Sequence, residues 1–507
     1  MMKALNKTLV LTALALACSQ AAWAGKADNT LRMPADQVLP DIDPYFNNEL
    51  LGSVLGLAVW DTLVVRDQKT GQIKGQLATD WREINETTVE FDLRKGVTFH
   101  NGQPFTADDV VYTINFIANP ANGVTNQRNV NWLKSAEKID SHKVRIHFKA
   151  PFPPYLEYLA LPIVIEPHEY YAKVGHKGQN VKPVGSGPYR ITKYEPGKLI
   201  VMEKNPNYYA GTPKSNAKIG KIEISFIPDV QTQIASLMTG NADLITTSIP
   251  KDMADNVAAN PALQVVTVPT TRVQFLQFNV LDTTASPAIK DVRVRQAIMH
   301  AIDREAIAKA TMGKGYKLLT AFCAPEQFGC SGKDVPQYEY NPAKTKALLE
   351  QAGATKGVSV TLNAFSARDT AEMIQGYLNK AGIKTTLVYE QYPAVRDKQR
   401  NGTSGVTFAS WGSYSINDVS AILPVYFGLE GDDTARDKEI ASLVLKAGTS
   451  MDQNARAADY GQALKLISER ALIAPLFTVT RNYPANKELN MGNQNGDRVL
   501  FYEMSWR

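Results

Sequence analysis

The regular exchange of strand and helix patterns in the second half of the chain constrains the fold most strongly. Residues 358–364, 384–389 and 405–410 have strand patterns, and amphipathic helical patterns alternate with them. The helical patterns cover residues 342–352, 368–381, 436–447 and 453–470. This βαβ rhythm is typical of an α/β domain, and we predict that fold class.

The length of the chain indicates more than one structural unit. With 507 residues it is about three times as long as a typical single domain. It has no low-complexity linker and no internal repeat, so we expect strands to connect the domains. Residues 268–276 are the predicted crossing from the first domain to the second, and residues 473–479 are the predicted return.

Composition and charge describe an ordinary globular protein. Hydrophobic residues make up 44% of the chain and charged residues 21%. The net charge is +5, and two of the positive residues, Lys3 and Lys7, lie in a segment that we expect to be removed, which leaves 5 − 2 = +3. A net positive charge this small disfavours nucleic-acid binding. No run of eighteen apolar residues follows the N-terminus, so no membrane span is predicted there.

The N-terminus has the pattern of a cleavable export signal. Residues 1–7 are short and positive, residues 9–17 are apolar, and Ala22-Trp23-Ala24 supplies small residues before a cleavage site. We predict a signal peptide over residues 1–24, a mature chain that begins at Gly25, and a periplasmic location. The alternative is lipid attachment at Cys18, although the residues before it fit a lipobox poorly.

Removal of the signal leaves two cysteines, Cys323 and Cys330. In an oxidising periplasm, cysteines this close together favour a disulfide over two isolated thiols. Their spacing does not fit a catalytic Cys-x-x-Cys motif. The six histidines are scattered singly and no further cysteine is present, so neither a metal site nor a cofactor is predicted.

Catalytic signatures were not found. The sequence has no Gly-x-Ser-x-Gly, His-Glu-x-x-His or Walker motif, and residues 185–190 (GSGPYR) fit a turn before a strand. The acidic pairs Asp108-Asp109 and Asp432-Asp433 fit helix capping or solvent exposure better than acid–base chemistry. We therefore predict a protein that is not an enzyme.

Further elements are predicted in both halves of the chain. Thr106 begins a helix as its N-cap, and Asp109 completes a capping arrangement. The remaining predicted strands cover residues 30–33, 89–94, 143–148, 198–203, 221–227, 262–280 and 473–480, and the remaining helices cover residues 54–63, 231–239 and 292–310.

Several motifs in the same order resemble one family over essentially the whole mature chain. They are ATDW (78–81), FDLRKGVTFHNGQPFTADDV (91–110), PVGSGPY (183–189), NPNYY (205–209), PD (228–229), DVRVRQAI (291–298) and YNPAK with Ala347, Leu348 and Leu349 (340–349). With these motifs the chain resembles extracytoplasmic solute-binding protein family 5, the dipeptide, oligopeptide and nickel-type binding proteins of ABC importers. Most of these residues are turn-forming or capping types, so we interpret them as scaffold. We expect Arg293 and Arg295 to pair with acidic residues.

The resemblance implies a two-lobed periplasmic binding protein fold of the large peptide-binding type, with a hinge between the lobes and a subdivided first lobe. Domain I would comprise residues 25–269 and 477–507, with an inserted subdomain at approximately 59–180. Domain II would comprise residues 270–476. A ligand would be trapped between the lobes.

The resemblance places the ligand loop after the strand at 405–410. Trp411 would stack on the ligand, with core packing as the alternative. Peptide binders of the family carry Asp three residues after this Trp, where it pairs with the ligand's α-amino group, and this chain has Tyr414 there. Asp418 is a candidate replacement, and its alternative role is to cap the helix that follows.

Nickel-chelate members suggest a second group of candidates. Arg128 and Trp132 resemble an Arg/Trp pair that those proteins direct into the cleft. A second arginine of that pattern is missing, because Leu161-Pro162 is followed by Ile163. An arginine there would bind a carboxylate through its planar fork, and the alternative for Arg128 is a position on a polar surface loop.

These observations predict the substrate-binding component of an ABC importer. The expected ligand is a small peptide or a peptide-like, carboxylate-bearing solute, and the expected protein partner is an ABC permease in the inner membrane. We expect the binding protein itself to be a monomer. An opine, a metal chelate or another non-peptide solute is the alternative ligand. A periplasmic chaperone or an enzyme on the same scaffold is the alternative from a different functional class.

Overall fold

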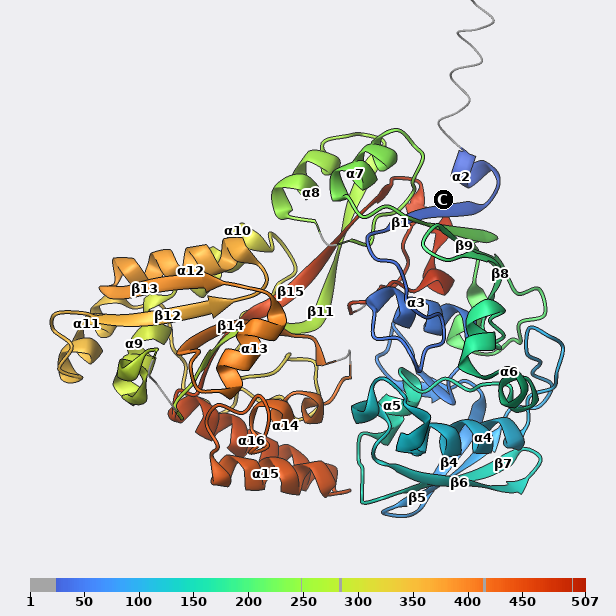
Figure 1. Cartoon of the computed structure of the whole chain (residues 1–507), viewed down its shortest axis with the longest axis horizontal. Helices are drawn as coiled ribbons and strands as arrows, with labels where there is room; N and C mark the ends of the chain where they lie inside the picture. Colours follow the sequence, from blue (N-terminus) through green and yellow to red (C-terminus); the bar gives the residue numbers. More distant parts are fainter. Residues whose placement is uncertain (1–23, 248, 282–284, 414–415, 495) are drawn as a thin grey trace, which may run out of the picture. The chain divides into compact units, whose positions relative to one another are not determined.

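The computed structural model describes residues 24–247, 249–281, 285–413, 416–494 and 496–507. The chain forms two compact units (Figure 1). Unit 1 takes in the chain up to Lys149, Tyr158–Thr267 and Asn482–Arg507, and unit 2 takes in Ala150–Glu157 and Val268–Arg481. Apart from the segment Ala150–Glu157, the chain changes units within two long strands, β11 (Leu263–Phe278) and β15 (Ile473–Asn486). The domain limits expected from the resemblance fall within the same two strands.

The first sheet of unit 1 has the strand order β1-β10-β9-β8. Its strands are β1 (Thr30–Ala35), β8 (Tyr189–Glu195), β9 (Leu199–Lys204) and β10 (Lys221–Phe226). β1 pairs with β10 in parallel, while β10 with β9 and β9 with β8 are antiparallel. These strands confirm the predictions at residues 30–33, 198–203 and 221–227.

The second sheet of unit 1 has the order β4-β5-β7-β6 and is entirely antiparallel. Its strands are β4 (Ala78–Asn85), β5 (Thr88–Leu93), β6 (Leu133–Asp140) and β7 (Lys143–Phe148). Helix α4 (Ala107–Ala118) packs on this sheet and begins with the predicted capping box. The Thr106 N–H donates to Asp109 Oδ2 at 2.7 Å, and the Thr106 hydroxyl accepts from the backbone of α4.

One helix of unit 1 differs from its prediction. Helix α3 (Leu50–Val59) ends four residues before the predicted limit at residue 63. Trp60 is extended, Thr62 forms a bridge with Val164, and the Ile165 N–H donates to the Asp61 carbonyl. Pairing with this distant segment therefore prevails over the local helical pattern.

Further helices and strands complete unit 1. They are α2 (Ala24–Ala27), β2 (Val64–Arg66), β3 (Ile73–Gly75), α6 (His168–Val181), α7 (Val230–Met238), α8 (Lys251–Ala258), β16 (Leu489–Asn490) and β17 (Ser505–Trp506), with α5 (Tyr155–Ala160) starting in the segment assigned to unit 2. α7 confirms the helix predicted at residues 231–239.

Unit 2 contains one mixed sheet with the order β13-β12-β14-β11-β15. β12 (Val358–Ala364) is parallel both to β13 (Ile383–Tyr389) and to β14 (Val406–Trp411), and β14 is antiparallel to β11. Buried clusters cover the two faces: Val273, Phe275 and Ala409 belong to one, and Leu276 and Phe408 to the other. The predicted α/β class and its alternation of strands and helices are confirmed.

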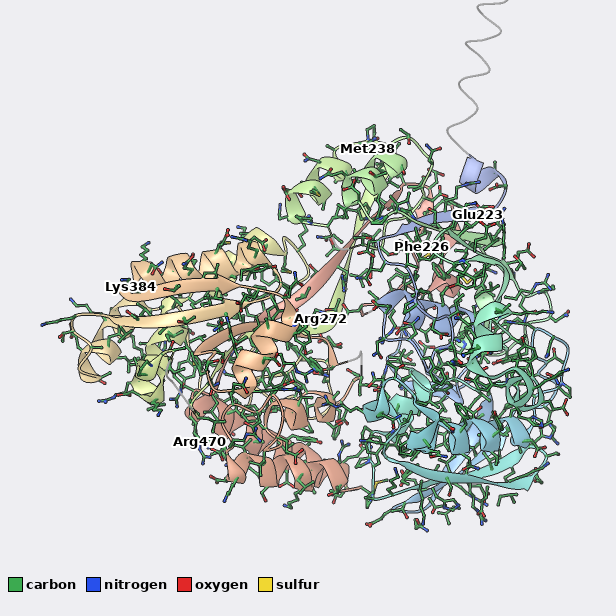
Figure 2. All side chains as sticks on the ribbon, in the orientation of Figure 1. Glu223, Phe226, Met238, Arg272, Lys384 and Arg470 are labelled. Atoms are coloured by element: carbon green, nitrogen blue, oxygen red, sulfur yellow. A yellow bond between two sulfur atoms is a disulfide. The ribbon has the colours of Figure 1, made fainter. Side chains whose placement is uncertain are left out.

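The helices of unit 2 surround this sheet (Figure 1). They are α9 (Val292–Ala301), α10 (Arg304–Thr311), α11 (Pro342–Gln351), α12 (Arg368–Lys380), α13 (Tyr392–Arg400), α14 (Leu423–Tyr426), α15 (Lys438–Thr449) and α16 (Gln453–Glu469). Arg470, which follows α16, bonds to Asp437 at the start of α15 and is labelled in Figure 2.

The structure corrects the prediction of one long helix in unit 2 and the predicted pairing of Arg295. The single helix expected over residues 292–310 is interrupted, because Ile302 is extended and Asp303 caps α10 by accepting from the Ala306 N–H at 2.9 Å. Arg295 does not pair with an acid. It is 6% exposed and donates to backbone carbonyls, including those of Ile289 and Ala471. Arg293 does pair with Asp291, as expected.

The predicted disulfide between Cys323 and Cys330 is present, with the two Cα atoms 5.7 Å apart. The predicted signal peptide covers residues 1–24, and all of it except Ala24 lies outside the described residues. Cys18 lies outside them as well. Within the described ranges, no helix has the length and apolar character needed to cross a membrane.

Candidate functional site

The candidate site lies at one edge of the unit 2 sheet. Because β12, β13 and β14 are parallel, their carboxyl ends point in the same direction. In open α/β sheets, ligands bind outside these carboxyl ends. Phe365 follows β12, Glu390 follows β13, and Trp411 is the last residue of β14. We call the residues at these strand ends, with Tyr392 and Arg396 of the adjoining helix α13, the carboxyl edge.

Trp411 is half-buried at this edge. Its indole Nε1 donates to the Ala421 carbonyl at 3.3 Å, and its ring meets Tyr426 edge-on with 6.1 Å between centroids. Part of the ring therefore packs against the unit 2 core, and the rest remains accessible. Core packing is therefore part of the role of Trp411, and its stacking on a ligand stays a prediction.

An aromatic and cationic surface continues along α13. The guanidinium of Arg396 lies 5.7 Å from the centre of the Tyr392 ring, and that ring is 4.9 Å from Phe365. Arg396 donates to both oxygens of Asp432, at 2.8 and 2.7 Å, and Arg400 donates to the same carboxylate at 3.2 Å. Hydrogen bonding to Asp432 raises the pKa of Arg396. Arg396 and Arg400 share the single carboxylate of Asp432, so these three side chains together keep one net positive charge.

Sequence reasoning missed this surface. Asp432 is 7% exposed, so the prediction that it caps a helix or faces solvent is wrong. The separation of more than thirty residues between Arg396 and Asp432 left no local signal of their pairing. Tyr392 is 42% exposed, and an exposed aromatic residue directly before a proline was the one signal available.

The loop after Trp411 contains polar atoms that lack partners among the described residues. The Ser413 side chain is buried, and neither its Oγ nor the Oγ of Ser420 has a hydrogen-bond partner there. Ser413 also has φ +49°, a left-handed conformation that a non-glycine residue adopts at a cost. Such features cluster at ligand sites. Tyr414 lies outside the described residues.

Asp418 caps a short 3-10 helix, Val419–Ala421, and accepts from the Ser420 N–H at 2.9 Å. Its other oxygen receives Arg456 Nη2 at 2.9 Å, and the two side chains are 5% and 4% exposed. Both carboxylate oxygens are therefore engaged inside unit 2. An incoming ammonium would have to displace Arg456, so the geometry favours the capping role.

Arg128 and Trp132 lie in unit 1. Arg128 is exposed on a 3-10 helix, Gln127–Asn129. Trp132 is 6% exposed, meets Phe148 edge-on at 4.9 Å, and donates to the Asn129 carbonyl at 2.9 Å. Its ring anchors the loop that carries Arg128, and a direct role of either residue in binding stays a prediction.

Two of the family-like motifs surround a buried ion pair in unit 1. Lys214 Nζ lies 2.9 Å from Asp61 Oδ1, and both side chains are fully buried. Tyr208 and Tyr209 of the NPNYY motif donate to Asp61 at 3.1 and 2.8 Å, and Ser186 of the GSGPY motif donates at 3.3 Å. Burial raises the pKa of both tyrosines well above the usual range. The interpretation of these motifs as scaffold fits this network.

A second buried polar cluster in unit 1 contains two carboxyl groups. Asp43 accepts from the Tyr171 hydroxyl and from the Tyr45 N–H, and burial raises its pKa to about 7. Glu166 Oε2 accepts from Trp60 Nε1 at 3.2 Å, while its Oε1 has no partner among the described residues. Burial, reinforced by the charge of Asp43, raises the pKa of Glu166 well above its usual value.

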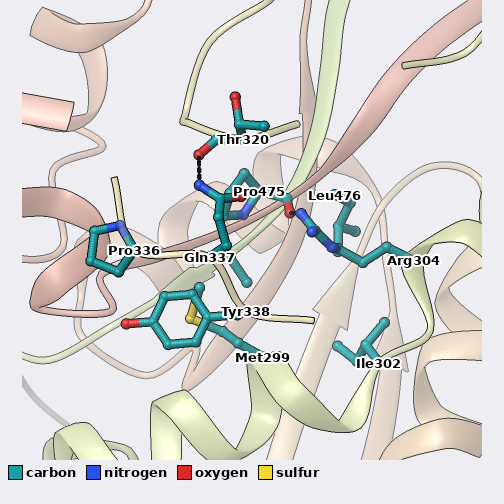
Figure 3. A pocket seen from close by; sticks show the side chains of 10 residues that line it. Met299, Ile302, Arg304, Thr320, Pro336, Gln337, Tyr338, Pro475 and Leu476 are labelled. Atoms are coloured by element: carbon teal, nitrogen blue, oxygen red, sulfur yellow. Dashed lines mark hydrogen bonds between the residues drawn. The ribbon is translucent and has the colours of Figure 1, made fainter. Parts of the chain in front are cut away.

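A pocket in unit 2 lies between Arg304, Gln337 and Pro475 and has room for about one water molecule (Figure 3). There Gln337 donates to the Thr320 carbonyl at 3.0 Å, and Arg304 donates to that of Pro475 at 2.8 Å. Across the described part of the chain, no three His, Cys, Asp or Glu side chains gather as a metal site would require.

Comparisons with known proteins identify the scaffold that carries this edge. The probable di/tripeptide-binding protein 5 of Pseudomonas aeruginosa is 26% identical over 479 residues, which cover 86% of this chain and 89% of that protein. The glutathione-binding protein of Salmonella choleraesuis is 29% identical over 385 residues, 74% of this chain and 72% of that protein. The structure of HbpA2 from Haemophilus parasuis matches with a TM-score of 0.79 and 25% identity, covering 94% of this chain and all of that one.

The family comparison agrees with the fold and the order of the motifs. Residues 72–433 match the family described as "Bacterial extracellular solute-binding proteins, family 5 Middle". The match includes the GSGPY and NPNYY motifs of unit 1 and all of β12, β13 and β14 in unit 2. Since it spans well over half of the chain, the chain belongs to family 5 of the bacterial extracellular solute-binding proteins.

Proposed function

We propose that this solute-binding protein is the periplasmic receptor of an ABC importer and captures a small peptide or a peptide-like solute that bears a carboxylate. The observation that carries the proposal is the carboxyl edge, where half-exposed Trp411 lies on the same edge of the unit 2 sheet as Arg396 and Tyr392. An aromatic ring offers a rigid surface to a side chain or peptide plane, and a guanidinium recognises a carboxylate. The di/tripeptide- and glutathione-binding relatives support this class of ligand.

A second candidate is a non-peptide anion such as an opine or a metal chelate. It is favoured by the state of Asp418, whose charge is already paired with Arg456. It is also favoured by Tyr414, which stands where peptide binders of the family carry an aspartate. Under this proposal Arg128 supplies a further positive charge from unit 1. The two candidates differ in whether the ligand needs a free amine.

The proposal includes export and delivery. The mature protein would begin at Gly25 in the periplasm, work as a monomer, and pass its ligand to a permease in the inner membrane without converting it. Ligand-induced closure of the two units without turnover would separate this function from that of an enzyme or a chaperone on the same scaffold.

The test is calorimetric titration of the mature protein with the dipeptide Ala-Phe and with glutathione. Native mass spectrometry of the protein as purified would identify any ligand that remains bound. We expect Trp411→Ala to weaken binding by about 2 kcal/mol, as truncation of a buried aromatic contact does. Trp81→Ala is the matched control, because Trp81 is also half-buried but lies on β4 of unit 1. Equal affinity of Trp411→Ala and the wild type would contradict the proposal.

A further inference from the structure

We propose that the loop closed by the Cys323–Cys330 disulfide is a positioning element for Trp411. With Arg456, this loop holds residues 416–419, and through them it fixes the carbonyl that receives the Trp411 indole. The inference rests on the proposed function only in treating Trp411 as a ligand contact. The contacts that carry it all lie within unit 2.

The first contact is a short backbone pairing between the disulfide loop and the segment after Trp411. The Phe328 N–H donates to the Asn417 carbonyl at 2.9 Å, and the Val419 N–H donates to the Phe328 carbonyl at 3.0 Å. The two bonds form a parallel bridge between Phe328 and Asp418. A loop of eight residues, from Cys323 to Cys330, is thus attached directly to the start of the Val419–Ala421 helix.

Gln327 strengthens this attachment. Its side chain is 3% exposed, and its Nε2 donates to the Ile416 carbonyl at 2.9 Å. Its Oε1 accepts from the Ala324 N–H at 3.1 Å, inside the disulfide loop. One amide group therefore connects the two segments. A glutamate carboxylate at position 327 would keep the oxygen that accepts from Ala324 and would lose the N–H that donates to Ile416.

The fit between the two segments is close. Gly329 has φ +80°, and a Cβ at this position would come within 2.7 Å of the Tyr460 ring and 2.9 Å of Val419 Cγ2. Only glycine satisfies both the left-handed backbone and this contact. The loop therefore packs directly on the residues that it holds.

Arg456 closes the arrangement from the other side. Its guanidinium lies 4.6 Å from the centre of the Phe328 ring and donates to Asp418 Oδ2 at 2.9 Å. Its Nε donates to the Ala447 carbonyl at 3.1 Å, which anchors it to α15. A buried guanidinium with these partners fixes Phe328 and Asp418 relative to each other.

The chain of contacts ends at Trp411. The short helix capped by Asp418 ends at Ala421, whose carbonyl accepts from the Trp411 indole at 3.3 Å. If the disulfide loop releases residues 416–419, this acceptor moves and the indole loses its fixed orientation. A binding surface that is ordered only part of the time has its affinity reduced by that fraction.

The experiment compares Gln327→Glu with Gln233→Glu. Gln233 is fully buried and donates through Nε2 to the Ile227 carbonyl, but it lies on α7 of unit 1. The double variant Cys323→Ser/Cys330→Ser opens the loop by an independent route and serves if Gln327→Glu does not fold. Three quantities are measured: amide exchange of Val419, the indole N–H resonance of Trp411 assigned with Trp411→Phe, and the affinity for Ala-Phe and glutathione.

We expect Val419 exchange to rise about tenfold in Gln327→Glu, because a buried hydrogen bond is lost and its partner stays desolvated. The Trp411 resonance should shift, and the affinity should fall with the fraction of molecules in which the ring loses its position, while Gln233→Glu changes none of the three. The inference is overturned if both loop variants keep the wild-type exchange rate at Val419 and an unshifted indole resonance of Trp411. Faster exchange with unchanged affinity for a probe that the wild type binds would also overturn it.

Failure of the proposed function gives a different result. If the wild type binds neither probe, the proposed ligand class fails, yet the exchange rate and the Trp411 resonance still decide whether the loop positions the ring. A shifted resonance in both loop variants would then support the positioning role, and an unshifted one would reject it.

Discussion

Asp418 shows at the residue scale how one side chain can be committed before any ligand arrives. Its carboxylate caps a 3-10 helix and pairs with Arg456, and both partners are buried. Replacement by Asn keeps the cap but leaves the Arg456 charge uncompensated. We expect Asp418→Asn to lower the free energy of unfolding by about 3 kcal/mol, the cost of breaking a buried pair. Urea unfolding of the variant measures this loss.

The control is Asp229→Asn, because Asp229 caps α7 from an exposed position and accepts from the Thr232 N–H at 2.8 Å. Asn caps helices about as well as Asp, so this change should leave stability nearly unaltered. Asp418→Asn should change the affinity for Ala-Phe and for N-acetyl-Ala-Phe to the same extent, since the Asp418 charge is already paired with Arg456. Unchanged stability of Asp418→Asn, combined with a selective loss of binding by the free amine, would restore the amine-anchor hypothesis.

Sequence reasoning identified single residues where their role is local. The cap at Asp418 and the capping box at Thr106 depend on neighbours two or three residues away. The Arg456 partner lies 38 residues from Asp418 in the sequence, and no pattern connects them. The positive charge at Arg396 was missed for the same reason. Partners brought together by tertiary folding decide what a charged side chain is free to bind.

The junction of α9 and α10 makes the same point at the element scale. The apolar periodicity continues through both helices, so it predicted one helix, but Asp303 caps the second. We expect Asp303→Ala to cost about 1 kcal/mol of stability, the usual value of an N-cap, and Asp303→Asn to cost little. Urea unfolding of the two variants tests this difference, and equal stability of Asp303→Ala and the wild type would contradict it.

Most elements of the unit 2 sheet could be predicted because alternation and periodicity are strong there. Strands β12, β13 and β14 match their predicted ranges within one residue. β15 continues six residues past the predicted end at 480, because pairing with β11 supports it where the apolar pattern fades. Helix α13 was missed altogether, since its polar sequence has few apolar positions. That helix carries Tyr392 and Arg396 of the carboxyl edge.

At the scale of the whole molecule, buried carboxyl groups are stabilised in different ways. Unit 2 pairs its buried Asp418 and Asp432 with arginines, and its buried Asp433 accepts backbone N–H groups. Unit 1 buries Asp43 and Glu166 among tyrosine, tryptophan and glutamine side chains, and among the described residues no cation bonds to either carboxyl. Burial raises the pKa of both groups, that of Asp43 to about 7. The fold therefore favours their protonated forms.

Asp43 and Glu166 are therefore predicted to contribute more to the stability of unit 1 in mild acid than at neutral pH. A carboxyl group whose pKa is raised by folding contributes its full stability below the unfolded pKa, 3.8 for Asp43, and loses it as the pH rises through about 7. For Asp43 alone, the expected loss between pH 4.5 and 7.5 is on the order of 3 kcal/mol. In Glu166→Gln one of the two groups no longer titrates, so the loss of stability should be smaller.

Urea unfolding, followed by hydrogen exchange of peptides from each unit, measures how the stability of each unit depends on pH. Unit 2 is the internal control, because its profile should be the same in the variant and the wild type. A unit 1 profile that Glu166→Gln leaves unchanged would mean that Glu166 is not held protonated by the fold.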